Sequence, residues 1–522
     1  MEELRAGARA ALQRHLGHSD FRPGQVELVE AVLSGRDALG VLPTGGGKSV
    51  TYQIPAALMK GVTLVVSPLL SLMSDQVARS CAAGIPAAYL GSTLSPAEAR
   101  RVAAQVEGGE VKLLLVSPER FRSPGFLSLL ESTKVALVAV DEAHCISQWG
   151  HDFRPDYLRL GEIRERVPAP VLAVTATATP RVREEIAREL RLRDPVTVVK
   201  SFDRPNLTWE VVDLPSRMDK VPRLHGLLRG LSGGVAVVYA ATRKGVEGLR
   251  SRLAALGWPV EAYHAGLSGP ERSRVQERFM SGGSRVVVAT NAFGMGIDKP
   301  DVRLVVHAEI SGSLEAYYQE AGRAGRDGGA GHCVVLHAPG DLAIHQGFRD
   351  RGYPEPALVR RIWAVLSALQ GDRRVAPVPL QLLALRVGLS RDQGLLLRGV
   401  HHLVQEGALR VVTPGGLPDP EEEVLEGVVP PPLPTPVLQR LSGGTPPLSG
   451  LQSARARESD RLEAVAAYLS TRGCRRAFLL RYFGEGAPSW CGRCDRCRGV
   501  PGPSSAWRTP RGVPLQSAPH EG

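Results

Sequence analysis

Short apolar runs alternate with helix-like stretches between about residue 20 and residue 340 of the chain. The runs are VTLVVSP, VKLLLVSP, KVALVAVDEAH, PVLAVTAT, GVAVVYA, SRVVVATN, VRLVVH and HCVVLH. Nearly continuous apolar strands separated by helices are typical of parallel sheets with both faces covered. The pattern breaks between Phe202 and Leu207. We therefore predict two α/β domains in tandem, over residues 1–204 and 205–345.

After residue 350 the apolar spacing becomes helical, with one face formed by Leu358, Ile362, Val365, Leu366 and Leu369. Two short helices and a β-tail are expected over residues 353–413, which fits a winged helix. Residues 414–455 are rich in Pro and Gly and predict a semi-extended linker. A helical pattern returns in residues 456–500 and ends in a cluster of cysteines. The Pro-rich residues 501–522 are expected to be disordered.

Composition adds a weak preference for an acidic partner. The 64 Lys and Arg residues exceed the 53 Asp and Glu residues, which gives a formal charge of +11 and a pI near 9.5. A basic protein releases counterions when it neutralises phosphates, although many basic proteins bind no nucleic acid. The N-terminus lacks the apolar core of a secretion signal, and no run of about 18 apolar residues occurs. We therefore expect a soluble cytoplasmic protein without a membrane partner.

A glycine-rich segment, LPTGGGKS, follows an apolar run and precedes a helical stretch. Backbone N–H groups of such a loop close around phosphates at a helix N-terminus, a lysine adds a point charge, and a hydroxyl binds Mg²⁺. The strict pattern has Gly where this chain has Leu42, and a glycine-rich turn that binds no nucleotide is the alternative. The position directly after a strand favours an ATP-binding loop formed by Thr44, Gly45, Gly46, Gly47, Lys48 and Ser49.

Two adjacent carboxylates, Asp141 and Glu142, end the apolar run KVALVAV. The carboxyl edge of a parallel sheet would place them beside the nucleotide. Asp141 suits Mg²⁺ binding, as does the Ser49 hydroxyl, and Glu142 suits orientation or deprotonation of the attacking water. An acidic turn at a strand end is the alternative. Its joint occurrence with LPTGGGKS favours an NTPase.

The segment YYQEAGRAGRDG in the second domain sets Gln319, Arg323 and Arg326 at helical spacing. A guanidinium supplied by a second domain would stabilise charge on the transferring phosphoryl group only when the two domains close. A solvated, arginine-rich helix end is the alternative. The presence of two α/β domains with one phosphate loop favours a catalytic role for all three residues.

Four of the seven cysteines are spaced C-x16-C-x2-C-x2-C, at Cys474, Cys491, Cys494 and Cys497. Four thiolates suit a tetrahedral, structural Zn²⁺ site without an open position, although this spacing does not exclude an iron–sulfur cluster. The remaining cysteines, Cys81, Cys145 and Cys333, are expected to be buried or incidental thiols. Three arginines lie near these cysteines in the sequence, Arg475, Arg476 and Arg493. We expect them either to contact phosphates or to form a solvated basic face.

Taken together, these motifs resemble the RecQ family of superfamily 2 helicases over about residues 12–340 and again over 456–498. FRPGQ, LPTGGGKS, SPLLSLMSDQ, DEAH, TATAT, NAFGMGIDKPDV and QEAGRAGRDG occur in the order of that family, and CRR, YFGE and CGRCDRC are similar to its zinc module. The resemblance implies two RecA-like domains, the first ATP-binding and the second the C-terminal helicase domain. It further implies that Gln25 reads the adenine edge, that Asp298 contacts the ribose side, and that zinc is the bound metal.

The stretch after DEAH, CISQWGHDFRP, is similar to the aromatic-rich loop of the same family. Trp149 and Phe153 can stack on single-stranded bases, which need only offer a π-face. The resemblance adds His151 and Arg154 as DNA contacts, and continuity with Glu142 implies coupling of DNA occupancy to hydrolysis. The alternative is that Trp149 and Phe153 are core aromatics under a long loop. The polar and Gly residues next to them argue against this alternative.

The resemblance implies an ATP-dependent helicase that moves 3′-to-5′ on single-stranded DNA and unwinds duplexes in recombination and repair. Its ligands would be ATP, Mg²⁺, Zn²⁺, single-stranded DNA and duplex DNA. Single-strand-binding and recombination proteins would be its protein partners, in the cytoplasm near the bacterial nucleoid. A DNA-remodelling or regulatory factor without unwinding is the alternative, and an RNA helicase is a weaker one.

The order of the C-terminal segments departs from the family pattern. The predicted winged helix lies between the motor and the zinc module, rather than after the zinc module. Its helix around Ser390 to Gln405 is expected either to bind duplex DNA or to pack against the motor, with no preference between these. The strand-separating hairpin of the family therefore cannot be assigned to residues of this chain.

Overall fold

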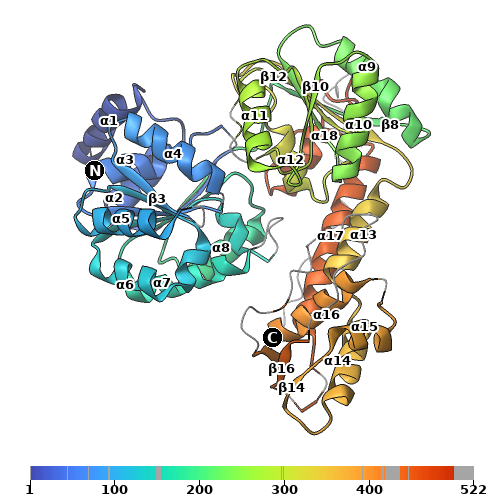
Figure 1. Cartoon of the computed structure of the whole chain (residues 1–522). Coiled ribbons are helices and arrows are strands. Elements are labelled where there is room, and N and C mark those ends of the chain that lie inside the picture. Colours follow the sequence, from blue (N-terminus) through green and yellow to red (C-terminus); the bar gives the residue numbers. More distant parts are fainter. Residues whose placement is uncertain are drawn as a thin grey trace, which may run out of the picture.

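The computed structural model describes residues 2–498, apart from 44, 69, 92–93, 149–153, 295–296, 298, 391, 413–416, 418–434, 442 and 445. Figure 1 shows two α/β lobes beside each other and a third lobe that two helices connect to the second one. None of the helices in the described part of the chain is long and apolar enough to cross a membrane.

The first lobe contains a seven-stranded parallel sheet with the order β3-β4-β2-β5-β6-β1-β7. Its strands are β1 (Ala38–Val41), β2 (Val62–Val66), β3 (Ala87–Leu90), β4 (Leu113–Val116), β5 (Val135–Val140), β6 (Val171–Thr175) and β7 (Val196–Val199). Its helices are α1 (Glu2–Leu16), α2 (Gln25–Leu33), α3 (Val50–Leu58), α4 (Leu70–Ala82), α5 (Pro96–Glu107), α6 (Pro124–Ser132), α7 (Leu160–Arg166) and α8 (Pro180–Glu189). Every residue of β1, β2, β4 and β6 is buried, as expected for strands covered on both faces.

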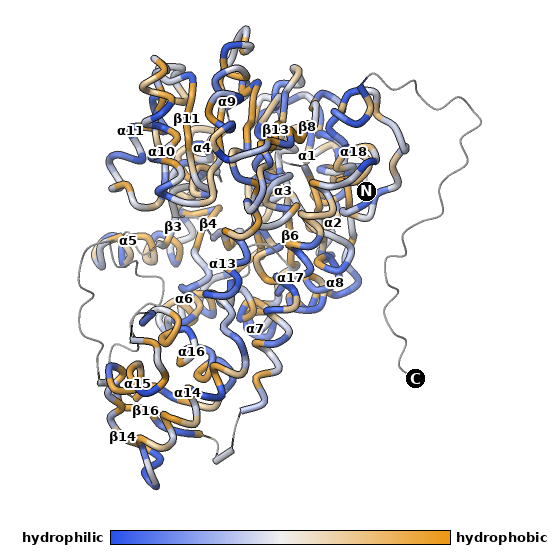
Figure 2. Tube along the Cα trace, turned by 90° about the vertical axis from the view of Figure 1, so that its right-hand side faces the viewer, coloured by the Kyte–Doolittle hydropathy of each residue, from blue (hydrophilic) through white to orange (hydrophobic). Residues whose placement is uncertain are grey.

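The second lobe contains a six-stranded parallel sheet with the order β10-β11-β9-β12-β13-β8. Its strands are β8 (Leu207–Asp213), β9 (Val235–Tyr239), β10 (Val260–Tyr263), β11 (Val286–Ala289), β12 (Val302–His307) and β13 (Gly331–His337). Its helices are α9 (Lys220–Arg229), α10 (Arg243–Ala255), α11 (Gly269–Met280) and α12 (Leu314–Ala321). Figure 2 shows labelled strands of both sheets among the most hydrophobic segments. The predicted pair of parallel-sheet domains is therefore confirmed.

Two helices in contact, α13 (Leu342–Gly352) and α17 (Ser449–Ser470), form a stalk that leads away from the second sheet. The described residues between them, within 353–448, form the third lobe, which we call the inserted unit. It contains α14 (Pro356–Gln370), β14 (Val375–Pro377), α15 (Leu380–Val387), α16 (Gln393–Gln405), β15 (Leu409–Val411) and β16 (Val437–Arg440). This element order, with an antiparallel β14-β16-β15 sheet and its own hydrophobic core, is that of a winged helix.

The predicted linker over residues 414–455 was wrong at its C-terminal end. Residues 437–440 form β16, whose Leu438 is fully buried between β14 and β15, and α17 begins at Ser449. Strand β16 is short and pairs with strands far away in the sequence, so a Pro- and Gly-rich composition concealed it. Residues 501–522 lie outside the described part of the chain.

Helix α16 packs against the stalk. It buries Leu396 and Leu403, and His402 Nε2 lies 3.2 Å from the Gly352 carbonyl oxygen at the end of α13. Glu406, directly after α16, accepts a hydrogen bond from Leu451 N–H of α17 at 3.0 Å. Of the two roles expected for this helix, packing is the one observed, although the packing is on the stalk rather than on the sheets.

Residues 471–498, at the end of the described part of the chain, are called the cysteine module. It contains α18 (Arg475–Tyr482) and a tight turn over residues 491–498. Tyr468 at the end of α17 lies beside Tyr317 of α12, with ring centroids 5.3 Å apart and the rings tilted by 47°. Within the module, the Tyr482 hydroxyl donates to Glu315 of α12 at 2.8 Å, so the cysteine module is held against the second α/β domain.

Candidate nucleotide site and metal centre

A cavity of about 710 Å³ lies between the carboxyl edge of the first sheet and the second domain. The first domain contributes Gln25, Gly45, Gly47, Lys48, Ser49, Asp141 and Glu142 to its walls. The second domain contributes Gln319, Arg323 and Arg326. The structure therefore brings these candidates, from four separate motifs, to one place.

The glycine-rich loop lies between β1 and α3, where its backbone needs left-handed conformations. Gly45 and Gly47 have φ values of 79° and 71°, which favour glycine. The Gln25 side-chain amide donates to the carbonyl oxygens of Gly46 and Gly47, each at 2.9 Å. Gln25, expected to read adenine, thus also fixes the loop. Thr44 lies outside the described residues.

Lys48 faces the two carboxylates at the end of β5. Its Nζ lies 3.7 Å from Glu142 Oε1, and both side chains are largely buried. Burial, followed by the Glu142 carboxylate, raises the pKa of Asp141 to about 6, while Lys48 opposes the shift. Crowded carboxylates with a nearby Ser49 hydroxyl form a set of hard oxygen ligands that fits Mg²⁺.

Glu142 has an unusual backbone conformation, with φ 46° and ψ 46°. A non-glycine residue in this left-handed region is strained, and such strain clusters at functional sites. The Glu142 N–H donates to Asp141 Oδ1 at 2.9 Å. The strained turn therefore aims both carboxylates into the cavity.

His144, which sequence reasoning did not select, connects this turn to the end of β6. Its Nδ1 lies 2.8 Å from Thr175 Oγ1 and 3.4 Å from Glu142 Oε2. Thr175 in turn donates to the Thr177 carbonyl oxygen at 3.3 Å. The sequence signal that could have selected His144 was its position two residues after Glu142 in DEAH. The contacts show that the TATAT segment lies beside the acidic pair.

The arginines of the second domain lie on a turn rather than on a helix. Helix α12 contains Gln319 but ends at Ala321, so the predicted helical continuation through Arg323 and Arg326 was wrong. Gly322 caps the helix and Gly325 adopts a φ of 58°, which turns the chain. We call residues 322–329 the arginine turn.

The arginine turn reaches across to the phosphate loop. A Cβ atom on Gly45 would lie 3.9 Å from Arg326 Cγ. The guanidinium of Arg326 donates to the Ile297 carbonyl oxygen at 2.6 Å, and Arg323 is buried beside it in the cavity wall. A guanidinium at this place can approach a terminal phosphate bound by the loop.

The DNA-contact candidates are only partly within the described residues. Trp149, His151 and Phe153 lie outside them, as does Asp298. Arg154 donates to the Pro68 carbonyl oxygen at 3.0 Å.

The described residue just before this loop is held from a distant part of the chain. The Gln148 carbonyl oxygen accepts a hydrogen bond from Arg461 of α17 at 3.2 Å. The start of the loop is thus in contact with the stalk.

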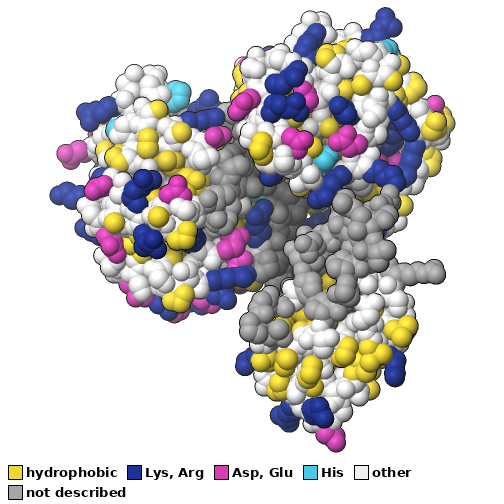
Figure 3. Space-filling model, in the orientation of Figure 1, with side chains coloured by type: hydrophobic (Ala, Val, Ile, Leu, Met, Phe, Trp, Pro, Cys, Tyr) yellow, Lys and Arg dark blue, Asp and Glu magenta, His cyan; other side chains and the backbone are white. Residues whose placement is uncertain are grey.

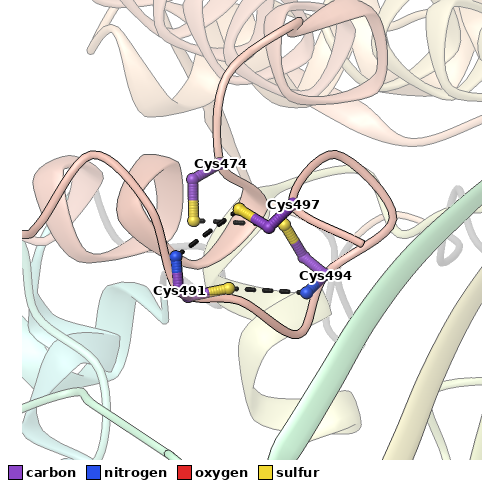
Figure 4. Close-up of side chains that lie close together, drawn as sticks. All are labelled: Cys474, Cys491, Cys494 and Cys497. Carbon is purple, nitrogen blue, oxygen red and sulfur yellow. Dashed lines mark hydrogen bonds between the residues drawn. The ribbon is translucent and has the colours of Figure 1, made fainter. Parts of the chain in front are cut away.

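Figure 4 shows the four cysteines of the candidate metal centre facing one another. All four sulfur atoms lie within 4.8 Å of one another, and Cys474, Cys494 and Cys497 are buried. Zinc–sulfur bonds of about 2.3 Å require sulfur atoms roughly 3.8 Å apart in a tetrahedron. The cluster therefore fits a closed zinc site, in which four thiolates would bind the ion and hold the module together.

The three basic residues near the cysteines bond groups of the protein. Arg475 is fully buried and pairs with Asp495, its nitrogen 3.1 Å from a carboxylate oxygen. Arg476 pairs with Asp203, and Arg493 donates to the Pro205 carbonyl oxygen at 2.8 Å. All three arginines bond protein groups, although Arg493 is exposed to solvent, and contacts of these residues with phosphates stay a prediction.

Three family models match successive parts of the chain. The DEAD/DEAH box helicase model matches residues 22–186, and the helicase conserved C-terminal domain model matches residues 219–328. The RecQ zinc-binding model matches residues 440–498.

Curated relatives include the ATP-dependent DNA helicase RecQ of Pasteurella multocida, 45% identical over 65% of this chain and 54% of that protein. The probable ATP-dependent DNA helicase RecS of Bacillus subtilis is 38% identical over 77% of this chain and 79% of that protein. The chain spans about half the length of the RecQ relatives that it matches.

Solved structures with the same fold include Mycobacterium smegmatis helicase Lhr bound to ssDNA and AMP-PNP. It has a TM-score of 0.52 and 22% identity, covering 74% of this chain and 55% of that one. The DUF1998 helicase MrfA bound to DNA and AMPPNP has a TM-score of 0.55 and 21% identity, covering 67% and 53%. At this identity the likeness concerns the fold.

Proposed function

Because this chain belongs to the RecQ family of superfamily 2 helicases, we propose that it hydrolyses ATP to move 3′-to-5′ along single-stranded DNA and separate duplexes. The observation that carries the proposal is the composite cavity. Lys48, Asp141 and Glu142 of one domain meet Arg326 of the other around it. Recombination and repair are the pathways that the family suggests.

The first domain binds and activates the nucleotide. Backbone N–H groups of residues 44–49 and the Lys48 ammonium bind the phosphates, and Gln25 contacts the adenine edge. Ser49 and Asp141 hold Mg²⁺, which supplies positive charge to the phosphates when bound. Glu142 orients the attacking water and accepts its proton as the water oxygen bonds to the γ-phosphorus and the bond to the β–γ bridging oxygen breaks, which releases ADP and phosphate.

The second domain completes the site. Arg326 and Arg323 stabilise negative charge on the transferring phosphoryl group, and Gln319 lines the same wall. Asp298 contacts the ribose side. Because these groups belong to a separate domain, hydrolysis and product release change the attraction between the domains. That change is the source of movement along DNA.

DNA acts through the loop that follows the acidic pair. Trp149 and Phe153 stack on bases, and His151 and Arg154 contact the same strand. The route from this loop to the nucleotide is short, since His144 contacts both Glu142 and Thr175. Occupancy of the loop would therefore alter the orientation of Glu142.

The cysteine module is proposed to hold Zn²⁺ as a structural ion, because its four sulfur atoms leave no open position. Single-stranded and duplex DNA are the proposed substrates, and single-strand-binding and recombination proteins the proposed partners. The proposed location is the cytoplasm, near the nucleoid.

A DNA-remodelling factor that does not separate strands is the second candidate. The inserted unit favours it, because α16 packs on the stalk instead of facing outward. Figure 3 shows hydrophobic side chains gathered on the lower lobe. Leu385 of the inserted unit is 67% exposed. This surface differs from the basic surface that duplex binding usually needs.

ATP turnover should be measured with single-stranded DNA, duplex DNA and RNA. We expect the largest stimulation with single-stranded DNA. Trp149→Ala should retain nucleotide affinity and basal turnover but lose most of the DNA stimulation. Trp258→Ala is the control, since Trp258 bonds His225 in α9, away from the cavity. Stimulation by RNA alone, or by no nucleic acid, would refute the proposal.

A further inference from the structure

The two α/β domains are joined by residues 201–206, which we call the connector. It follows β7 and precedes β8, and it lies between the arginine turn and the cysteine module. Its side chains make hydrogen bonds in both directions. The connector therefore does more than link the two sheets.

On one side, the connector binds the backbone of the arginine turn. The Arg204 guanidinium donates to the carbonyl oxygens of Gly322 at 3.1 Å, Ala324 at 2.8 Å and Gly325 at 3.1 Å. The Asn206 amide donates to the carbonyl oxygens of Gly325 and Gly329, each at 2.8 Å. These carbonyl oxygens follow the end of α12, where no helical N–H group is available to bond them. Five side-chain hydrogen bonds from Arg204 and Asn206 take the place of the missing helical hydrogen bonds.

The contact is close enough to restrict the sequence of the turn. A Cβ atom on Gly325 would lie 2.5 Å from Asn206 Nδ2, and the φ of this residue is 58°. The same turn carries Arg323 and Arg326 into the nucleotide cavity. The position of these guanidiniums therefore depends on the two connector side chains.

On its other side, the connector is held by the cysteine module. Glu485 accepts from Ser201 Oγ at 2.5 Å and from Phe202 N–H at 2.8 Å. Asp203 forms an ion pair with Arg476. The Phe202 ring stacks on Phe483 with centroids 4.4 Å apart. The cysteine module thus fixes the residues that directly precede Arg204.

We propose that Arg204 and Asn206 are positioning residues for the arginine turn, and that Glu485 and Arg476 of the cysteine module hold them in place. The cysteine module thereby supports ATP hydrolysis without touching the nucleotide. This inference rests on the proposed ATPase function. It assigns to the connector the task of keeping Arg326 at the distance that the phosphoryl group requires.

The test uses the full chain with Arg204→Met, which keeps the length of the side chain but removes its donors. We expect kcat for DNA-stimulated ATP turnover to fall about 100-fold, the cost of misplacing a catalytic group by about 1 Å. Affinity for a non-hydrolysable ATP analogue should change less than about twofold, whereas affinity for ADP–aluminium fluoride should fall with kcat. Arg204→Lys should recover part of the loss, because an ammonium can still donate to one or two carbonyls.

Arg217→Met is the matched control. Arg217 also donates to a glycine carbonyl, that of Gly340 at 2.5 Å, and pairs with Asp341 in the same domain. It does not bond the arginine turn, so turnover should stay within about twofold of the wild-type rate. A double variant, Arg204→Met with Arg326→Ala, should lose clearly less than the product of the two single losses, because both changes affect the Arg326 interaction and only the position of Arg323 remains to be disturbed.

Hydrogen exchange over residues 322–329 gives a readout that does not need activity. The amides of the arginine turn should exchange faster in Arg204→Met and, to a smaller degree, in Glu485→Gln. Unchanged exchange would overturn the positioning role, as would additive losses in the double variant. If the wild-type chain failed to hydrolyse ATP, the proposed function would fall, whereas wild-type turnover in Arg204→Met would refute the connector inference alone.

Discussion

The two sheets of the motor are built alike, yet each lines the nucleotide cavity with a different edge, the carboxyl edge of the first sheet and the amino edge of the second. The first edge carries a self-contained cradle, in which Lys48 and Glu142 lie 3.7 Å apart on adjacent loops of one domain. The second edge supplies Arg326 from a turn whose backbone is held by the connector. Binding groups are thus local to one domain, while the group proposed for transition-state stabilisation depends on contacts from three parts of the chain. Variants that separate binding from turnover test this difference.

The largest effect is expected for Lys48→Ala. In the proposed function the Lys48 ammonium would contact phosphates in both the bound and the transition state, so its loss should remove measurable ATP turnover and weaken nucleotide affinity together. Isothermal titration with an ATP analogue and a phosphate-release assay measure the two quantities. Lys60→Ala is the control, because Lys60 is exposed on the same domain. Intact turnover in Lys48→Ala would show that the loop is not the nucleotide site.

Arg326→Ala should separate the two quantities. An arginine that acts on the transferring phosphoryl group contributes about 1,000-fold or more to kcat. We expect such a loss with nearly unchanged nucleotide affinity. Arg250→Ala, on the half-exposed helix surface of the same domain, should have the wild-type rate. An equal loss of affinity and kcat would place Arg326 among the binding groups and remove the contrast between the two edges.

Removal of the metal centre should affect the second edge more than the first. Cys491→Ser should lower the zinc content and weaken the contacts between the cysteine module and the connector. We expect ATP turnover to fall about tenfold, which corresponds to about 1.4 kcal/mol of activation free energy. Metal content is measured by atomic absorption, and opening of residues 201–206 by limited proteolysis. Cys81→Ser, at an exposed thiol of the first domain, should retain the metal. Full zinc content in Cys491→Ser would contradict the four-cysteine site.

The smallest effect concerns the pH dependence of the second domain. A hydrogen bond from His332, 2.7 Å from Glu210, lowers the pKa of this half-buried carboxyl. Because the folded pKa is depressed, the stabilisation is present above the unfolded pKa of about 4.3 and is lost as pH falls below about 4. We expect about 1 kcal/mol, allowing for solvent screening.

Thermal unfolding of Glu210→Gln at pH 3.5 and pH 7 measures this contribution. The variant should lose stability at pH 7 but little at pH 3.5. Asp213→Asn is the control, because Asp213 pairs with His337 in a more exposed position. Equal losses at both pH values would indicate that the ionised form of Glu210 contributes nothing.

The sequence predicts well those features whose residues lie close together in the chain. The phosphate loop, the acidic pair and the four cysteines are each short segments, so their chemistry could be inferred from spacing alone. The phosphate loop and the acidic pair meet in one cavity because the carboxyl ends of parallel strands share one edge. The two parallel-sheet domains were predictable for the same reason, since each strand is a continuous apolar run.

Features that depend on distant contacts were not predictable. The Asp203–Arg476 pair joins residues 273 positions apart, and neither neighbourhood indicates the other. Helical spacing suggested that α12 continues through Arg326, but carbonyl contacts to Arg204 stabilise a turn there instead. Likewise, β16 is a strand only because β14 and β15 flank it. In each case tertiary partners decide the local conformation.

Strand release from a duplex with a single-stranded 3′ tail is the most direct test of the central claim that ATP-driven closure of the two domains separates DNA strands. We predict release that requires ATP and Mg²⁺, that is absent with Lys48→Ala, and that is much slower with a 5′ tail. DNA-stimulated ATP turnover without release from either substrate would contradict the account and favour a remodelling factor.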